Sequence, residues 1–514
     1  MELELRQEQI SCWENVFQTT LNQEGTLEMI VPDACPDILQ ILDGEGSLFV
    51  QRKEATDGQG SVTGEIRVSI LYQPDGGNGL CCMDAVLPFR CTGDDPRITR
   101  RCSLQVLPQI QSIDIRLLNP RKVLIRANYS LTITAYLPGN LSVAGCAERP
   151  ENFGLCQKTG EFQTFLAVAV QDKTFTYSDT LSLPSGHPGA ANILRTKGEC
   201  ACSEAKIIGN KLVMKGEVEL ELLCLSADNE IRKEQFQIPF SQIMDANEAG
   251  EEAVTQVTCL ITELMVKPED TTNGQTVSVD LELLVQAVMS KTAACPMLQD
   301  LYSTDYGVEA EQKVYSSDAL RDTDSAVENV REVLETGVRP ESIFDILVRP
   351  GKLSMGRDGG ELSLGSDTEV CVLILGEDGN LYAVHRRMAV SHRIMAMDQL
   401  EYRCELSVNK KAAVITGSGI EVSFSMEFRW TVFERRSVTG VARATLDESK
   451  KRDSHNSPNL VVRPVREGEN LWDIAKAYYA SGQAIQSANQ LPSEELFPGQ
   501  MLLIPRQGRK KASS

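Results

Sequence analysis

The sequence has no long apolar run and no basic excess. No stretch approaches the roughly 18–20 uninterrupted apolar residues of a membrane-spanning helix, so we expect no membrane span. Lys and Arg number 51 against 72 Asp and Glu, a formal net charge of −21, whereas nucleic-acid binders carry a basic surface. The first residues also show no basic segment followed by an apolar core, as a secretory leader has. We therefore expect a cytoplasmic protein that binds neither nucleic acid nor an anionic membrane surface.

The 15 cysteines form no recognisable framework. They are scattered from Cys12 to Cys404, contain no CxxC pair, and include residues inside apolar runs, such as Cys224 and Cys371. In such a run a thiol acts as a small hydrophobic group. Disulfide frameworks are typical of short exported chains. We therefore expect reduced, largely buried thiols.

Catalytic and metal-binding motifs are also missing. The sequence has no GxxxxGK[ST] phosphate loop and no GxSxG nucleophile turn. Of the four histidines, His187 and His455 lie in turn or linker sequence. His385 and His392 lie seven residues apart, without carboxylate or thiol partners at the close spacing of metal ligands. We predict no enzyme, no catalytic residues, no metal site and no cofactor.

An internal repeat is the most informative feature that is present. Three β-rich segments align at a step of 152 residues, each with a glutamate at the same place. Asp, Asn and Gly residues follow each segment, and these residues accept the backbone conformations of tight hairpin turns. Each segment is therefore predicted to be the first strand of a β-hairpin. The segments are GEIRVSILY (64–72), GEVELELLC (216–224) and TEVCVLIL (368–375), and the glutamates are Glu65, Glu217 and Glu369.

Each repeat also ends in a strand whose apolar residues alternate with polar ones. A period of two places one face in a core and the other in water. Antiparallel strands with short turns predict a β-sandwich or a partly open barrel in each repeat. The fold class is therefore mainly all-β, with three tandem antiparallel β domains. The alternating residues are Ile125, Ala127, Tyr129, Leu131 and Ile133, then Val277, Val279, Leu281, Leu283 and Val285, then Ile420, Val422, Phe424, Met426 and Phe428.

Composition predicts two helices and a linker besides the strands. Residues 3–20 and 325–336 have helix-forming composition, the second with Ser325 as its N-cap. A nearly apolar-free stretch, 444–460, reads as a flexible linker. The predicted organisation is an N-terminal helix with the first β domain (1–150), a second β domain (151–305), a third (306–443), the linker (444–460), a C-terminal module (461–506) and a basic tail (507–514).

The C-terminal module reads as a compact β-α-α-β unit. Asn470 is the predicted N-cap of a helix that continues through Tyr479, with Leu471, Ile474, Ala475 and Tyr478 on one face. A second helix holds Ile485 and Ala488, and Met501 to Ile504 form the closing strand.

The motifs GENLWDIA, IxxAN and LFPGQMLLIP of this module resemble the LysM domain. Gly468-Glu469-Asn470 stands where that family usually has Gly-Asp-Thr. The resemblance implies binding of N-acetylglucosamine glycans, or docking of a partner, in a groove between two loops. Trp472 either stacks on a sugar or packs inward. Carried over, the groove residues are Gly468, Glu469, Asn470, Leu471, Trp472, Leu496, Phe497, Pro498 and Gly499.

The first repeat, with PDACPDILQIL, GEIRVSILY and LLNPRKVLIRA, resembles the SPOCS domain of spore-forming bacteria. SPOCS repeats followed by a LysM domain are similar to spore-coat morphogenesis proteins. The resemblance implies a non-enzymatic scaffold in the mother-cell cytoplasm, at the forespore surface, whose LysM domain docks the coat morphogenetic ATPase, stage IV sporulation protein A. The alternative is a peptidoglycan-binding protein with the β domains as spacers. A hydrolase hidden in a β domain is disfavoured by the missing catalytic residues.

Overall fold

A computed structural model describes residues 1–76, 79–148, 150–184, 190–226, 230–269, 276–417, 419–451 and 460–505. Antiparallel strands make up the three repeats, and the α-helices lie in the C-terminal module. The prediction of a mainly all-β protein is confirmed. The described sheets are open, and none of them closes into a barrel.

Each repeat begins and ends with a long strand, and the two strands pair along their whole length. β1 (Leu5–Ile30) pairs with β6 (Lys122–Ala147), β7 (Leu155–Ser182) with β12 (Thr276–Ser303), and β13 (Gly307–Leu334) with β19 (Gly419–Asp447). A short 3-10 helix, Pro150–Phe153, joins the first two repeats.

The two helices predicted outside the C-terminal module are wrong. Residues 5–20 belong to β1, and residues 325–334 belong to β13. In β13, Ala326, Val330 and Leu334 face inward at intervals of four residues. A spacing of four keeps side chains on one face of a helix and also on one face of a strand. The pairing of β13 with β19 makes this segment a strand and not a helix, because long-range pairing overrides weak helix propensity.

The shorter strands of each repeat form a second sheet that faces the long pair. The predicted hairpins are confirmed, since β3 pairs with β4, β9 with β10, and β16 with β17. The bounds are β2 (Ile38–Thr56), β3 (Gln59–Pro74), β4 (Cys81–Asp94), β8 (Ala190–Ile208), β9 (Lys211–Ser226), β10 (Ile231–Asp245), β14 (Pro340–Arg349), β15 (Ser354–Asp358), β16 (Glu361–Gly376) and β17 (Leu381–Met395).

One further strand in each repeat widens the sheet of long strands. These strands are β5 (Ser103–Asn119), β11 (Val254–Pro268) and β18 (Leu400–Thr416). The alternating apolar residues of β6, β12 and β19 point into the space between the two sheets and are buried, as predicted. Each repeat is therefore a sandwich-like lobe with its own hydrophobic core.

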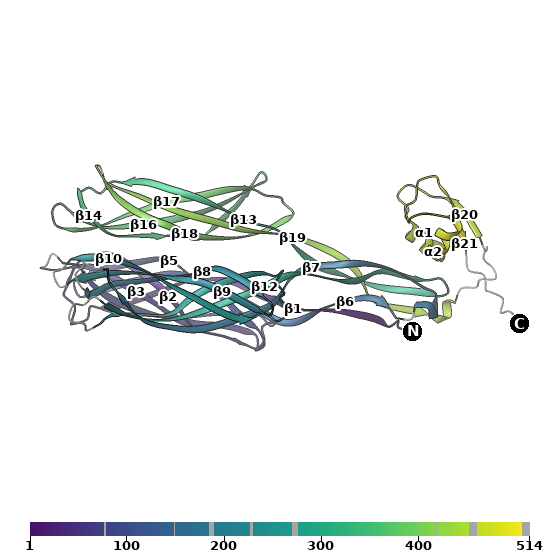
Figure 1. The fold of residues 1–514 in the computed structure, drawn as a ribbon, viewed down its shortest axis with the longest axis horizontal. Coiled ribbons are helices and arrows are strands. Elements are labelled where there is room, and N and C mark those ends of the chain that lie inside the picture. The colour runs from purple at the N-terminus through teal and green to yellow at the C-terminus, as the bar shows by residue number, and fades with distance from the viewer. Residues whose placement is uncertain are drawn as a thin grey trace.

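The long strand pairs continue beyond the lobes and form a common stalk (Figure 1). The apolar side chains of the stalk come from all three repeats and pack into one cluster. The stalk therefore fixes the three repeats to one another through a shared core. The buried residues of this cluster are Leu3, Ala144, Ala147, Leu298, Leu301, Val441, Ala444 and Leu446.

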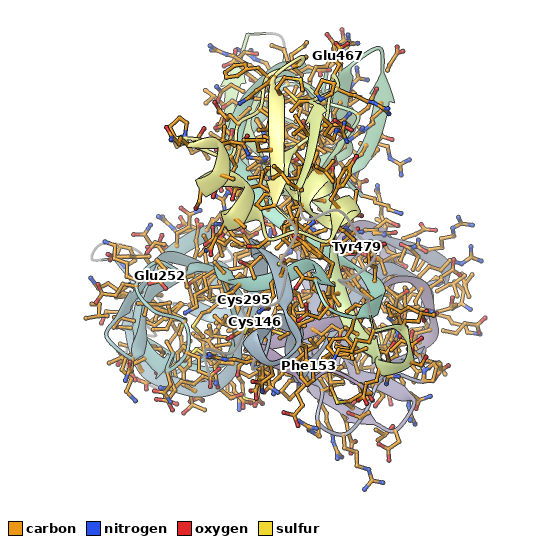
Figure 2. All side chains as sticks on the ribbon, turned by 90° about the vertical axis from the view of Figure 1, so that its right-hand side faces the viewer. Cys146, Phe153, Glu252, Cys295, Glu467 and Tyr479 are labelled. Carbon is orange, nitrogen blue, oxygen red and sulfur yellow. The ribbon has the colours of Figure 1, made fainter. Side chains whose placement is uncertain are left out.

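The three lobes surround a common axis, which Figure 2 shows from the stalk end. Strand β4 of the first lobe contacts β8 of the second, β10 of the second contacts β14 of the third, and β17 of the third contacts β2 of the first. Each lobe thus uses the same two edges, one toward each neighbour. A head-to-tail contact of this kind closes into a ring when the rotation fits, and here it closes after three repeats.

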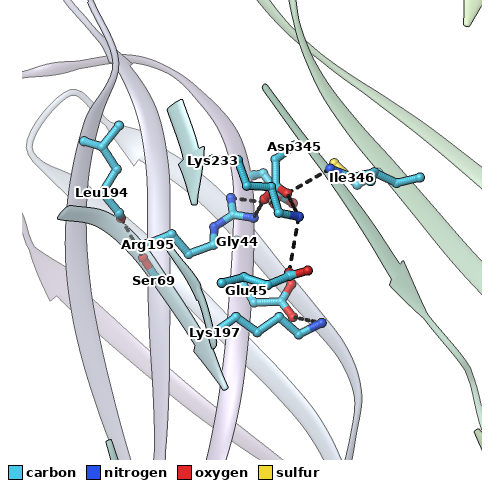
Figure 3. Close-up of polar contacts among 12 residues, drawn as sticks. Gly44, Glu45, Ser69, Leu194, Arg195, Lys197, Lys233, Asp345 and Ile346 are labelled. Carbon is cyan, nitrogen blue, oxygen red and sulfur yellow. Dashed lines mark hydrogen bonds and ion pairs between the residues drawn. The ribbon is translucent and has the colours of Figure 1, made fainter. Parts of the chain in front are cut away.

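Equivalent residues of the three lobes meet where the ring closes. Asp43 lies opposite Leu71 in the register of β2 and β3, Arg195 opposite Leu223, and Asp345 opposite Leu373. Each leucine lies three residues before the end of its strand, so the step to the third repeat is 150 residues here. The predicted equivalence of Glu369 with Glu65 and Glu217 is therefore wrong by two residues. The three leucines join a buried apolar cluster that spans the lobes. Beside this cluster Arg195 bridges the other two charges, with Nη2 2.9 Å from Asp43 Oδ2 and Nη1 3.2 Å from Asp345 Oδ2. Figure 3 shows Arg195 and Lys233 converging on Asp345.

The C-terminal module has the predicted β-α-α-β order. It comprises β20 (Leu460–Pro464), α1 (Leu471–Tyr478), α2 (Gly482–Asn489) and β21 (Met501–Pro505). The predicted linker begins too early, because β19 continues through Asp447 and a 3-10 turn, Glu448–Lys450, follows it. The remaining linker residues 452–459 and the predicted basic tail 507–514 lie outside the described residues.

Candidate functional site in the C-terminal module

The start of α1 is built by two of the predicted groove residues. The Asn470 side chain accepts a hydrogen bond from the backbone N–H of Asp473 at 2.8 Å, which is the N-cap predicted from the sequence. Leu471 is buried and packs with Ile474 and Ala475 in the core of the module. Asn470 and Leu471 therefore hold the helix in place, and Leu471 has no surface to offer a ligand.

The two loops of the predicted groove lie side by side. The Val465 N–H donates to the carbonyl of Gln500 at 2.9 Å, and the Gly499 N–H donates to the carbonyl of Val465 at 2.8 Å. Gly468 and Gly499 have φ angles of +80° and +84°, which glycine adopts without steric cost. Glu469 pairs with Arg463, and this hydrogen bond lowers the pKa of the Glu469 carboxyl. Glu469 is therefore a charged partner within the loop.

Trp472 packs inward, against the second repeat. Its Nε1–H donates to Asp300 Oδ2 on β12 at 2.8 Å, and its ring meets the Tyr302 ring edge-on with centroids 5.0 Å apart. Lys476 Nζ lies 2.7 and 2.8 Å from the two oxygens of Asp300. The Tyr302 hydroxyl donates to the carbonyl of Ala480 at 2.7 Å. Trp472 thus fastens the module to the stalk.

The sequence analysis did not predict the residues of the stalk that contact the C-terminal module. Asp300 and Tyr302 lie near the end of an ordinary alternating strand, and Tyr302 belongs to the core of the C-terminal module. Burial is the main cause that raises the pKa of the Tyr302 hydroxyl, with its hydrogen bond to Cys156 as the next cause. No local pattern marks such residues, because their partners lie more than a hundred residues further along the chain.

The sheet of the module presents an apolar face to solvent. Residues of β20 and β21 alternate, so that Leu502 and Ile504 point into the core while their neighbours point outward. Leu460 and Val462 are 52% and 53% exposed, and Met501 and Leu503 are 60% and 36% exposed. Figure 1 shows both strands on the side of the module away from the lobes. We call Leu460, Val462, Pro464, Met501 and Leu503 the outer sheet face.

Only part of the predicted groove remains accessible. Phe497 is 69% exposed, and Pro498 and Gly499 beside it are also exposed. Gly468 and Asn470 are exposed in the facing loop, whereas Leu496 is half-buried against the core. The structure thus brings the two loops together and separates accessible residues from those used for folding. A binding role for the accessible ones stays a prediction.

Comparison with known families agrees with this architecture. The family model described as "SipL, SPOCS domain" matches residues 37–118 and again 190–269, which lie in the first two repeats. The family model described as "LysM domain" matches residues 465–505. The chain thus contains two segments similar to the SPOCS domain and one similar to the LysM domain. In this combination of domains it resembles SipL.

The third repeat falls outside the matched segments but has the same strand order, with β15 added. No curated protein and no solved structure matches the chain. Neither matching family is a family of enzymes. Among the described residues, no helix has the length and apolar character needed to cross a membrane.

Proposed function

We propose that this chain is a non-enzymatic scaffold of endospore coat assembly. It acts in the cytoplasm of the mother cell, at the forespore surface, where its LysM domain docks the coat morphogenetic ATPase, a protein like stage IV sporulation protein A. The SPOCS and LysM domains support the sporulation setting and a binding role. The docking step and its partner are our proposal.

The outer sheet face is the observation that carries the docking step. It presents five apolar side chains on adjacent strands, and contiguous exposed apolar residues mark interaction surfaces. The neighbouring chain segments bring no large apolar residue to cover it, because 452–459 reads RDSHNSPN and 506–514 reads RQGRKKASS. A second molecule is therefore the expected cover.

The chemistry of this face favours a protein over a glycan. Sugars are recognised by polar groups that bond their hydroxyls and by an aromatic ring that stacks on them. The outer sheet face contains neither, and Trp472 is engaged by Asp300 and Tyr302. Exposed aliphatic and Met side chains suit the apolar surface of a protein, as at other interfaces.

The fastening of α1 to the stalk suits a scaffold. Trp472, Lys476 and Tyr302 hold the helical side of the module against β12, so that the strands face outward at the end of the molecule (Figure 1). A fixed orientation lowers the entropy lost when a partner binds. The lobes and the docking face are thus held in one arrangement.

Charge substitutions on the outer sheet face test the proposal. Val462→Glu and Leu503→Glu in the full chain are expected to abolish co-purification of the ATPase from sporulating cells, because each buries an unpaired carboxylate in the contact. Ala488→Glu, an exposed position on α2, is the matched control and should retain the partner. Loss of binding in the control alone, or in none of the variants, contradicts this docking face.

Cell-wall sedimentation separates the glycan alternative. Purified chain is expected to stay in the supernatant when mixed with isolated peptidoglycan. Strong retention that Phe497→Ala removes would instead favour the groove as a glycan site. In cells, labelled protein should ring the forespore, and uniform label throughout sporulation would contradict the scaffold role.

A further inference from the structure

A cysteine and a histidine face each other across the hairpin of the third repeat. The register of β16 and β17 places Cys371 directly opposite His385, and Cys371 Sγ lies 3.8 Å from His385 Nε2. Asp43 approaches the pair from β2 of the first repeat. One ligand atom from each of the three side chains lies within 4.8 Å of the other two.

We propose that Asp43, Cys371 and His385 bind a divalent transition metal ion, with zinc as the reference ion. A thiolate, an imidazole nitrogen and a carboxylate oxygen form a donor set that suits zinc. The site joins β2 of the first repeat to β16 and β17 of the third. The ion would therefore link two lobes whose ligands are separated by more than three hundred residues of chain.

The distances suit this coordination. Bonds of about 2.0–2.3 Å to a tetrahedral ion place neighbouring ligand atoms roughly 3.3–3.8 Å apart. The sulfur and nitrogen lie 3.8 Å apart, and one ligand atom from each of the three side chains lies within 4.8 Å of the other two. The His385 side chain is 46% exposed, which gives an ion a path to the site and leaves room for a water molecule as fourth ligand.

His385 has a carboxylate near its second ring nitrogen. Its Nδ1 lies 3.8 Å from Glu369 Oε1, while its Nε2 points toward the Cys371 sulfur. A carboxylate on the second ring nitrogen orients a ligating histidine and raises its basicity. Glu369 in turn lies 3.7 Å from Arg349.

Asp43 offers an oxygen that the protein does not fully satisfy. Its side chain is almost completely buried, and Oδ2 accepts no aligned hydrogen bond although Arg195 Nη2 lies 2.9 Å away. Arg349 contacts the other oxygen, Oδ1, at 3.3 Å. A buried carboxylate oxygen without an aligned donor is rare, so Asp43 can accept a further partner such as a metal ion.

The surrounding charges leave room for a dication. In the ion-pair network of the described residues, carboxylates outnumber cationic side chains by one. Ionisation of Cys371 adds a second negative charge, and its proton passes to solvent when the ion binds. A divalent ion then brings the network to neutrality. The carboxylates are Asp43, Glu45, Glu199, Glu221, Asp345 and Glu369, and the cations are Arg195, Lys197, Lys233, Arg349 and Lys411.

Metal binding by the full chain tests the site. The reduced protein is dialysed against zinc, and bound metal is measured per chain. Cys371→Ser and His385→Gln are each expected to lose one bound ion. Cys224→Ser, a buried thiol on the middle strand of the second repeat, and His392→Gln, on the same strand as His385, are the matched controls and should retain it. Equal binding by the site variants and the controls would overturn the proposal.

Cobalt provides a readout of the ligands themselves. Co²⁺ bound to the full chain is expected to show a sulfur-to-metal charge-transfer band that Cys371→Ser diminishes and Cys224→Ser leaves unchanged. Circular dichroism and gel filtration of each variant establish that it folds. A folded Cys371→Ser protein with an unchanged cobalt spectrum would exclude Cys371 as a ligand.

Discussion

A single arginine links the three repeats at the residue scale. Arg195 is almost completely buried and contacts Asp43 of the first repeat and Asp345 of the third. The three residues occupy equivalent register positions of the repeats, and these positions hold charges of opposite sign. A buried ion pair is costly to break, since removal of one partner leaves an unpaired buried charge.

Loss of this arginine is expected to be strongly destabilising. Arg195→Ala should lower the free energy of unfolding by about 3–5 kcal/mol, because Asp43 and Asp345 lose their shared cation. Urea unfolding at neutral pH measures the change. The control is Arg232→Ala, which removes a surface pair with Glu230 and should cost less than about 1 kcal/mol. Similar losses in both variants would contradict a central role for Arg195.

The charge network also predicts a dependence on pH. Burial would raise the pKa of Glu221, but Lys233 and Lys411 outweigh it and lower the pKa below its ordinary value of 4.5. A lowered pKa gives stability that is present above the ordinary value and is lost as pH falls through the folded-state pKa. We expect Glu221→Gln to weaken the loss of stability on acidification below about pH 4.5.

Chemical denaturation at a series of pH values tests this expectation. Glu219→Gln, an exposed carboxylate on the same strand, is the control and should keep the acid dependence of the unchanged protein. An acid dependence that is identical in all three proteins would show that Glu221 does not contribute.

At the scale of the element, glycines at equivalent places in two middle strands make room for an aromatic ring of the neighbouring strand. Gly64 lies opposite Phe89 in the register of β3 and β4, and Gly216 lies opposite Phe240 in β9 and β10. A Cβ at Gly64 would lie 2.8 Å from the Phe89 ring and 2.0 Å from the carbonyl oxygen of Phe49. Both glycines thus leave the space that the ring and the neighbouring strand occupy.

Alanine at these glycines is expected to push the sheets apart. Gly64→Ala and Gly216→Ala should each lower the free energy of unfolding by about 1–3 kcal/mol, as overpacked sites do. Gly356→Ala on β15 is the control, because a Cβ there meets no atom within 4 Å. Thermal unfolding compares the three variants, and an unchanged midpoint for Gly64→Ala would contradict the close packing.

At the scale of the whole molecule, the ring of lobes closes within one chain. Each lobe contacts the preceding lobe with one edge and the following lobe with another. Each of these edges therefore has a partner within the chain. Removal of one lobe would open the ring and expose two complementary edges, together with part of the shared leucine cluster.

A chain of residues 1–303 is therefore expected to self-associate. Its first and second lobes retain complementary edges on β2 and β10, and an unclosed head-to-tail contact recruits further copies. Light scattering during gel filtration measures the mass. A chain of residues 1–451 keeps all three lobes and should remain a monomer. A monomeric 1–303 chain that unfolds as cooperatively as 1–451 would contradict the closed ring.

The sequence by itself determined the strands, the hairpins and the terminal module. Period-two alternation and Asp, Asn and Gly turns are local signals, and they sufficed for the hairpins of all three repeats and for the Asn470 cap. The pairing of Cys371 with His385 was also within reach, because the turn after β16 fixes the hairpin register.

Only the tertiary structure decided which surfaces meet. Composition predicted helices at 3–20 and 325–336, but pairing with β6 and β19 places residues 5–20 and 325–334 in strands. Trp472 of the C-terminal module packs against Asp300 and Tyr302, which lie on β12 of the second repeat. Asp43 of the first repeat likewise meets Arg195 of the second and Cys371 of the third only because the lobes pack together. Contacts between residues distant in sequence leave no local pattern, since they depend on how the three lobes close around their axis.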